Sequence, residues 1–88
     1  MKLEVRINKI INDNSKLKAI ATVCIEGQFL VTGVRIYDSS RGLFVAMPSR
    51  RTVNGEYRNI CFPINKEFRE EISKEVKNVY YQEREVVR

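Results

Sequence analysis

Hydrophobic and polar residues alternate along the first half of the chain, which is the pattern of half-buried β-strands. In residues 3–11 apolar side chains fall at every second position, with polar side chains between them. A turn-forming cluster at residues 12–16 is followed by a second alternating run, residues 17–26, which ends at Gly27. Because consecutive strands joined by short turns usually pair with each other, we expect an antiparallel meander.

The third run, residues 28–38, changes the phase of its alternation. Val31 would lie on one face of a regular strand and Val34 on the other. One extra residue in the strand would bring both valines to the same face, and glycine is the residue that tolerates such an insertion best. The sequence therefore predicts a β-bulge at Gly33.

Asn54 and Gly55 are the sharpest local signal in the chain. A two-residue type I′ turn needs positive φ at both central positions, and Asn-Gly tolerates this best. We therefore predict a β-hairpin that folds back at this pair. Counting outward from the turn places Arg51 opposite Arg58, with Arg50 one position further out. Like charges in opposite positions cost roughly 0.2–1 kcal/mol, so an anion that bridges them would relieve this repulsion.

The C-terminal segment changes from a period of two to a period of about 3.6. Its apolar residues form one stripe at helical spacing: Phe68, Ile72, Val76, Val79 and Tyr80. Asn65 is a favourable N-cap, and Glu67 suits the positive end of the helix dipole. We expect an amphipathic helix from Asn65 to about Arg84.

These patterns predict an α+β fold: an antiparallel sheet of about five strands covered by one C-terminal helix. Residues 1–84 would form a single domain, with residues 85–88 as a short tail. A chain of 88 residues buries only about 60% of its unfolded surface, and a meander leaves edge strands exposed. We therefore expect a homodimer.

The positive charge of the chain belongs to the predicted sheet. The net charge is +5; ten basic and five acidic residues precede Lys66, and six of each follow from that position. A basic sheet points to a polyanionic partner, foremost nucleic acid, with an anionic membrane surface as the competitor. The alternative is that the arginines are solvated and protect a sheet edge from aggregation.

Six basic side chains are candidates for nucleic-acid contact. The primary candidates for phosphate or base contact are Arg50, Arg51 and Arg58. The secondary candidates are Arg41, Lys66 and Arg69. Lys66 and Arg69 lie in the first turn of the predicted helix, where free backbone amides favour phosphate.

The sequence gives no support for an enzyme. It contains no histidine and no Gly-rich phosphate loop, and its acids outside the helix are scattered. We expect no cofactor, no metal, no membrane partner and no small-molecule substrate. Cys24 and Cys61, each in a predicted strand, are interpreted as buried, reduced thiols of a cytoplasmic protein. The N-terminus does not resemble a signal peptide, and no apolar run is long enough to span a membrane.

The segment from Gly42 to Asn65, GLFVAMPSRRTVNGEYRNICFPIN, resembles the signature of the stage V sporulation protein G family. The preceding LKAIATVCIEGQFLVTGVRIYD and the N-V-Y-Y end of the closing helix fit the same family. The departures are small: Arg50 stands where lysine is also common, and Cys61 occupies a variable position. The resemblance implies a dimeric bacterial nucleic-acid-binding regulator, tied in spore formers to sporulation and to the control of asymmetric septation.

We therefore predict a regulatory protein that binds DNA, with RNA as a second nucleic-acid partner. The arginine hairpins of two subunits would anchor it electrostatically, and groups at the helix start would add sequence preference. The alternative is a protein-interaction module of the division or sporulation machinery, in which the hairpin docks on an acidic protein surface. Salt-dependent binding to random duplex DNA separates the two hypotheses, because the second predicts little of it.

Overall fold

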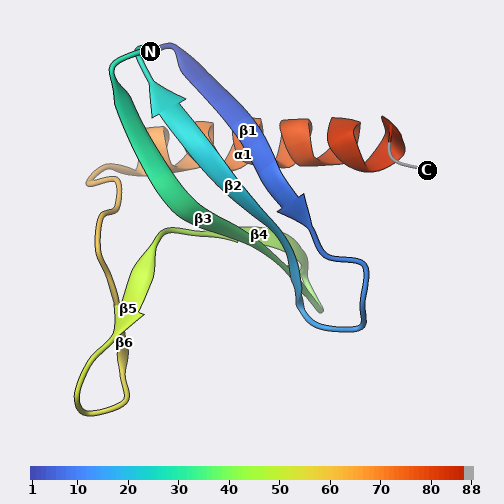
Figure 1. The fold of residues 1–88 in the computed structure, drawn as a ribbon. Helices are drawn as coiled ribbons and strands as arrows, with labels where there is room; N and C mark the ends of the chain where they lie inside the picture. The colour runs from blue at the N-terminus through green and yellow to red at the C-terminus, as the bar shows by residue number, and fades with distance from the viewer. Residues whose placement is uncertain (87–88) are drawn as a thin grey trace.

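The computed structural model describes residues 1–86 and consists of six β-strands followed by one α-helix (Figure 1). The elements are β1 (Leu3–Ile10), β2 (Leu17–Ile25), β3 (Phe29–Ser39), β4 (Gly42–Ala46), β5 (Ser49–Arg51), β6 (Tyr57–Asn59) and α1 (Lys66–Val86). The first four strands form an antiparallel sheet in the order β1-β2-β3-β4, and α1 covers one face of it (Figure 1). The predicted α+β fold, with its antiparallel meander and C-terminal helix, is confirmed.

The hairpin is not a part of this sheet. Strands β5 and β6 pair with each other in a separate two-stranded sheet, which projects from the body of the molecule (Figure 1). The expectation of about five strands in one sheet was therefore wrong. Pro48 stands between β4 and β5, and because proline has a fixed φ and no N–H, it ends the pairing of β4 and redirects the chain. We call residues 48–62 the arm.

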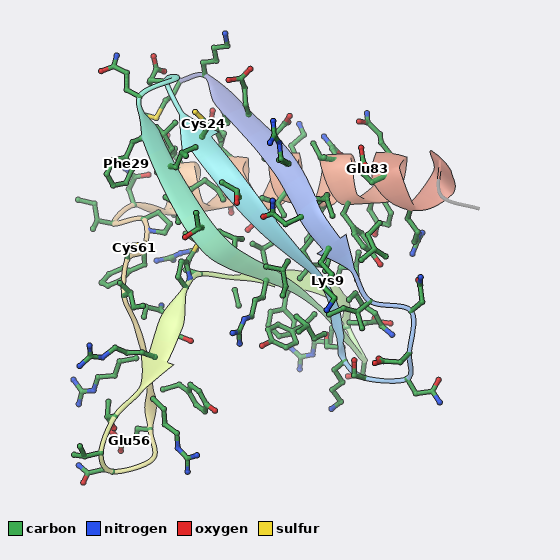
Figure 2. All side chains as sticks on the ribbon, viewed as in Figure 1. Lys9, Cys24, Phe29, Glu56, Cys61 and Glu83 are labelled. Atoms are coloured by element: carbon green, nitrogen blue, oxygen red, sulfur yellow. The ribbon has the colours of Figure 1, made fainter. Side chains whose placement is uncertain are left out.

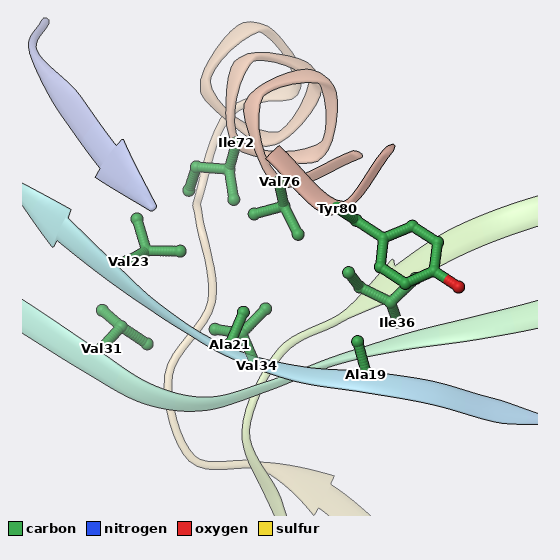
Figure 3. Close-up of a cluster of buried hydrophobic side chains, with 9 residues drawn as sticks. All are labelled: Ala19, Ala21, Val23, Val31, Val34, Ile36, Ile72, Val76 and Tyr80. Carbon is green, nitrogen blue, oxygen red and sulfur yellow. The ribbon is translucent and has the colours of Figure 1, made fainter. Parts of the chain in front are cut away.

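The hydrophobic core lies between the sheet and α1 (Figure 3). Its buried side chains come from β2, β3 and α1: Ala19, Ala21, Val23, Val31, Val34, Ile36, Ile72, Val76 and Tyr80. No polar or charged side chain of the described residues is buried with them. The three helical residues belong to the apolar stripe predicted from the sequence, which is therefore confirmed as the face that packs on the sheet.

The predicted bulge at Gly33 is confirmed. Ala21 pairs with Val34 and Val23 pairs with Val31, so that β3 contains one residue more than β2 between these pairs. Gly33 adopts a φ of 79°, which glycine tolerates without strain. The bulge brings Val31 and Val34 to the same buried face of an otherwise regular strand.

The hairpin forms at the predicted place but in a different register. Arg50 lies opposite Arg58, and Arg51 lies opposite Tyr57. The prediction that Arg51 faces Arg58 was therefore wrong by one residue. Two arginines still face each other across the strands, but the first of the pair is Arg50.

The cause of the shift is the length of the loop. The Thr52 amide donates to the Glu56 carbonyl oxygen at 2.7 Å, and the Gly55 amide donates to the Thr52 carbonyl oxygen at 3.0 Å, which leaves a loop of three residues. Gly55 has a φ of 84°, whereas Asn54 is not in the positive-φ region. This is the three-residue hairpin loop that ends in a left-handed glycine, rather than a type I′ turn. The two consecutive positive φ values of a type I′ turn occur instead at Glu26 and Gly27.

Asn65 caps the helix as predicted. Its side-chain oxygen Oδ1 accepts a hydrogen bond from the Phe68 amide at 2.7 Å, which satisfies one of the free N–H groups of the first turn. The helix continues to Val86, two residues beyond the predicted end at Arg84, since no glycine or proline follows to stop it. Residues 87–88 of the predicted tail lie outside the described residues.

Both cysteines are free thiols, but neither is fully buried. Cys24 lies in β2, whereas Cys61 lies after β6 in the connection to α1. The expected strand around Cys61 does not form, because the hairpin has left the sheet and β6 ends at Asn59. Within residues 1–86, no helix has both the length and the apolar character that crossing a membrane requires.

The N-cap provides a first test of the fold. Replacing Asn65 with Ala should lower the free energy of unfolding by about 1 kcal/mol, because the Phe68 amide loses its acceptor. Asn78, an exposed residue in the middle of α1, is the matched control. Asn78→Ala should be neutral or slightly stabilising, since alanine is the better helix former. Urea unfolding measures both variants, and equal losses would contradict the assigned cap.

The register of the arm provides a second test. Replacing Arg50 with Ala removes the repulsion from Arg58, so the arm should be unchanged or stabilised by a few tenths of a kcal/mol. Arg51→Ala is the control, because Arg51 faces Tyr57 and no cation. Hydrogen exchange at the Thr52 amide, which closes the loop, reports on the arm locally. A marked loss of protection in Arg50→Ala alone would show that this side chain stabilises the arm.

Candidate nucleic-acid interface

The three primary candidates all lie on the arm, and all three are exposed. Side chains of neighbouring residues in a strand point to opposite faces. Arg50 and Arg58, which are paired, therefore share one face of the arm, and Arg51 lies with Tyr57 on the other. The arm presents cations on both sides rather than as a single patch.

The charge of the arm is only weakly compensated. Glu56 is the one acidic residue between Asp38 and Glu67, and it lies near the tip of the arm (Figure 2). Its carboxylate is 3.9 Å from Nη2 of Arg58, and both side chains are largely exposed. An exposed pair of this kind contributes at most about 1 kcal/mol. The arm therefore keeps a positive field that is open to a polyanion.

Arg51 lies over the loop at the tip. A Cβ atom added to Gly55 would come within 3.5 Å of Nη2 of Arg51. Such a contact is an ordinary van der Waals distance, so it is the positive φ of Gly55, 84°, that favours glycine at this position of the loop. This arrangement places one cation at the point of the arm furthest from the sheet.

The arm and the segment that follows it also expose large apolar side chains, which were not predicted from the sequence. They are Val53, Tyr57, Ile60, Phe62 and Ile64. A signal was present in the sequence, since the only two prolines, Pro48 and Pro63, bracket the arm. Proline interrupts strand pairing, so residues between two prolines need not join the sheet, and their apolar side chains need not enter its core.

The base of the arm meets the start of α1. Nη2 of Arg69 donates to the Pro63 carbonyl oxygen at 3.3 Å, and Lys66 is exposed in the same helical turn. Arg69 also lines a groove of about 280 Å³ beside β4, together with Asn59 and Phe62. The structure therefore brings one secondary candidate, Arg69, to the base of the arm, with Lys66 close to it in the chain.

Arg41 is separated from the other candidates. It lies in the turn between β3 and β4, at the opposite end of β4 from the arm (Figure 1). Its amide donates to Oγ of Ser39 at 3.3 Å, and that hydroxyl donates to the Gly42 carbonyl oxygen at 2.8 Å. These bonds order the turn, and they give Arg41 no connection to the arm.

Acidic side chains do not gather near the arm. Asp13 lies in the β1–β2 turn, where hydrogen bonds from the Ser15 hydroxyl and amide hold the pKa of its carboxyl below the usual value. Within residues 1–86, no three Cys, Asp or Glu side chains lie close enough together to hold a metal ion. The arm is thus a surface of cations and apolar groups.

Comparison with known proteins identifies the family. The SpoVG family model matches residues 1–82. The septation protein SpoVG of Macrococcus caseolyticus is 46% identical over 77 residues, which cover 88% of this chain and 66% of that protein. The relative from Heliobacterium modesticaldum, with the same name, is 48% identical over 88% of this chain and 85% of its own length. The relative from Staphylococcus saprophyticus is 43% identical over 96% and 82% respectively. The chain that carries this sheet, helix and projecting arm therefore belongs to the SpoVG family.

Proposed function

We propose that this protein is a cytoplasmic regulator that binds DNA, and also RNA, in a role related to septation and sporulation. The projecting arm is the observation that carries the proposal, because it holds Arg50, Arg51 and Arg58 away from the body with a single acid among them. The name of the relatives, septation protein SpoVG, supports the cellular role.

The shape of the arm suits duplex DNA. The major groove admits a two-stranded β-ribbon, and β5 and β6 form such a ribbon. With the ribbon in the groove, Arg50 and Arg58 on one face would reach the phosphates of one strand, and Arg51 on the other face would reach those of the other strand. Contacts to phosphates position a protein and make its affinity depend on salt.

Binding would also relieve the repulsion within the arm. Arg50 and Arg58 lie directly opposite each other, and this arrangement is unfavourable while no anion lies between them. A phosphate shared by the two guanidinium groups would replace the repulsion with charge-assisted hydrogen bonds. Lys66 and Arg69 would add contacts from the helix start, where backbone amides also favour phosphate.

A homodimer is part of the same proposal. Ile60 and Ile64 are 62% and 90% exposed, although isoleucine side chains are usually buried in the cores of proteins. An isolated two-stranded hairpin is only marginally stable in water. A second copy of the chain that covers these two side chains, at the end of the arm and just after it, would stabilise the hairpin and would present two arms to one nucleic acid.

The competing function is a protein-interaction module in which the same arm docks on an acidic protein surface. Both functions use the arginines, so the substitution of an arginine alone does not separate them. Binding to random duplex does separate them, because counterion release from DNA gives a steep salt dependence.

Binding measured at several salt concentrations tests the arm. The double variant Arg50→Ala with Arg51→Ala should flatten the slope of log K against log salt by roughly two per subunit, since each lost phosphate contact lowers it by about 0.9. Lys2→Ala with Lys74→Ala removes the same charge from exposed sites outside the arm and should leave the slope nearly unchanged. Unchanged binding in the arginine variant would remove the arm from the site.

Sedimentation tests the dimer. At micromolar concentration the protein should sediment at about twice the chain mass of 10.3 kDa. Ile60→Ser with Ile64→Ser should shift it toward the monomer, because both changes remove apolar surface that the partner would cover. Leu30→Ser, at a side chain that is also 62% exposed but lies on the sheet, is the control. A single 10.3 kDa species in the unmodified protein would refute the dimer.

A further inference from the structure

The face of the sheet that points away from α1 is open, and we call it the outer face (Figure 1). Its cations can be placed from the strand register. Ile20 lies between the buried Ala19 and Ala21, so it points outward, and it pairs with both Lys9 and Arg35. Arg6 pairs with the next outward residue of β2. The exposed residues Arg6, Lys9 and Arg35 therefore share the outer face, and Lys9 is visible there in Figure 2.

Two stacked aromatic rings lie on the same face. Tyr37 follows the buried Ile36, so it points outward, and it pairs with Phe44 of β4. The two ring centroids are 5.3 Å apart and the ring planes differ by 21°. Because β4 is an edge strand, no further strand lies beyond Phe44, whose side chain is 47% exposed. A third flat ring could extend this stack.

A hollow of about 570 Å³ lies further along the outer face, over β1, β2 and β3. Its walls carry the polar groups of Glu4, Arg6, Asn8, Thr22 and Thr32, so that one carboxylate faces the same hollow as the Arg6 guanidinium group. Oγ1 of Thr22 donates to Oδ1 of Asn8 at 2.7 Å, which leaves the Asn8 amide N–H groups to donate to a ligand. Four residues of β3 lie between Thr32 and Tyr37, a distance of roughly 15 Å.

We infer that the outer face binds single-stranded nucleic acid. One base would stack on the Tyr37–Phe44 pair, a base further along the strand would place its polar edge in the hollow, and the cations would hold the phosphates between them. Basic surfaces with exposed aromatic rings are how proteins hold unpaired strands, since every base has a flat face for stacking. Within a duplex these faces are already covered by neighbouring base pairs, so this surface selects single strands.

This inference deepens the proposed function and rests on it, but it uses a different surface. The arm contains Arg50, Arg51 and Arg58, whereas the outer face contains none of them. Duplex binding through the arm and single-strand binding through the sheet can therefore be disabled separately.

The test compares labelled single-stranded RNA and DNA oligonucleotides of mixed sequence with the duplex of the same sequence, by fluorescence anisotropy on the full chain. Phe44→Leu keeps the apolar bulk and removes the aromatic face. It should weaken single-strand binding about tenfold, because one stacking contact is lost, and should leave duplex binding unchanged. Arg35→Ala, at an exposed site, should weaken single-strand binding severalfold and make it less dependent on salt.

Two controls accompany these variants. Phe29→Leu makes the same substitution at a ring that is 62% exposed but lies on the helix side of the sheet, beside Phe68 and Ile72; it should bind both probes normally. Arg50→Ala with Arg51→Ala should lose duplex binding and keep single-strand binding. Thermal unfolding of every variant separates loss of binding from loss of fold.

Photo-crosslinking locates the strand directly. An oligonucleotide that carries 5-iodouracil should crosslink to Tyr37 or Phe44, as identified by mass spectrometry. Crosslinks confined to the arm or to α1, or single-strand affinity that stays normal in both Phe44→Leu and Arg35→Ala, would overturn the inference. If the unmodified protein binds duplex but not single strands, the outer face is refuted while the arm stands. If it binds neither, the proposed function fails as a whole.

Discussion

The packing of α1 on one face of the four-stranded sheet is the interaction on which the rest of the structure depends. Ile72, Val76 and Tyr80 are the buried residues of the helix, and they meet the alanines and valines of β2 and β3. Within residues 1–86 this single layer is the whole core, and no second helix covers the other face of the sheet. One side of the sheet is consequently structural, and the other is free to bind a partner.

Because of the bulge at Gly33, β3 contributes side chains both to the core and to the outer face of the sheet. β3 is the longest strand, with 11 residues, and without an inserted residue its two buried valines would point in opposite directions. The insertion brings Val31 and Val34 under the helix and restores the alternation beyond them. Arg35 and Tyr37 then face outward. The same bulge therefore completes the core and also places these two side chains on the outer face.

The strands of the arm, in contrast to β3, are separated from the core. Pro48 ends the pairing of β4, and the strands that follow bond to each other alone. Their side chains stay exposed, including apolar ones that are costly to leave in water. The proposed dimer would cover these apolar side chains, and the opposed Arg50 and Arg58 make an anion favourable on one face of the arm.

The sequence by itself determined those features that depend on short-range chemistry. The two periodicities identified sheet and helix, Asn65 marked the cap, and Gly33 marked the bulge, because each depends on a few neighbouring residues and one preferred backbone geometry. The family resemblance is likewise carried by contiguous residues. The concentration of positive charge before Lys66 could also be counted directly.

Only the tertiary structure decided the register of the hairpin, its separation from the sheet and the grouping of the site residues. The observed loop contains Val53 as well as Asn54 and Gly55, and this one extra loop residue exchanged Arg51 for Arg50 opposite Arg58. Arg69 lies at the base of the arm because the arm leads into the start of α1, whereas Arg41 lies at the opposite end of β4. The path of the chain after β4 decides which of these cations lie near one another, and no spacing in the sequence reveals that path.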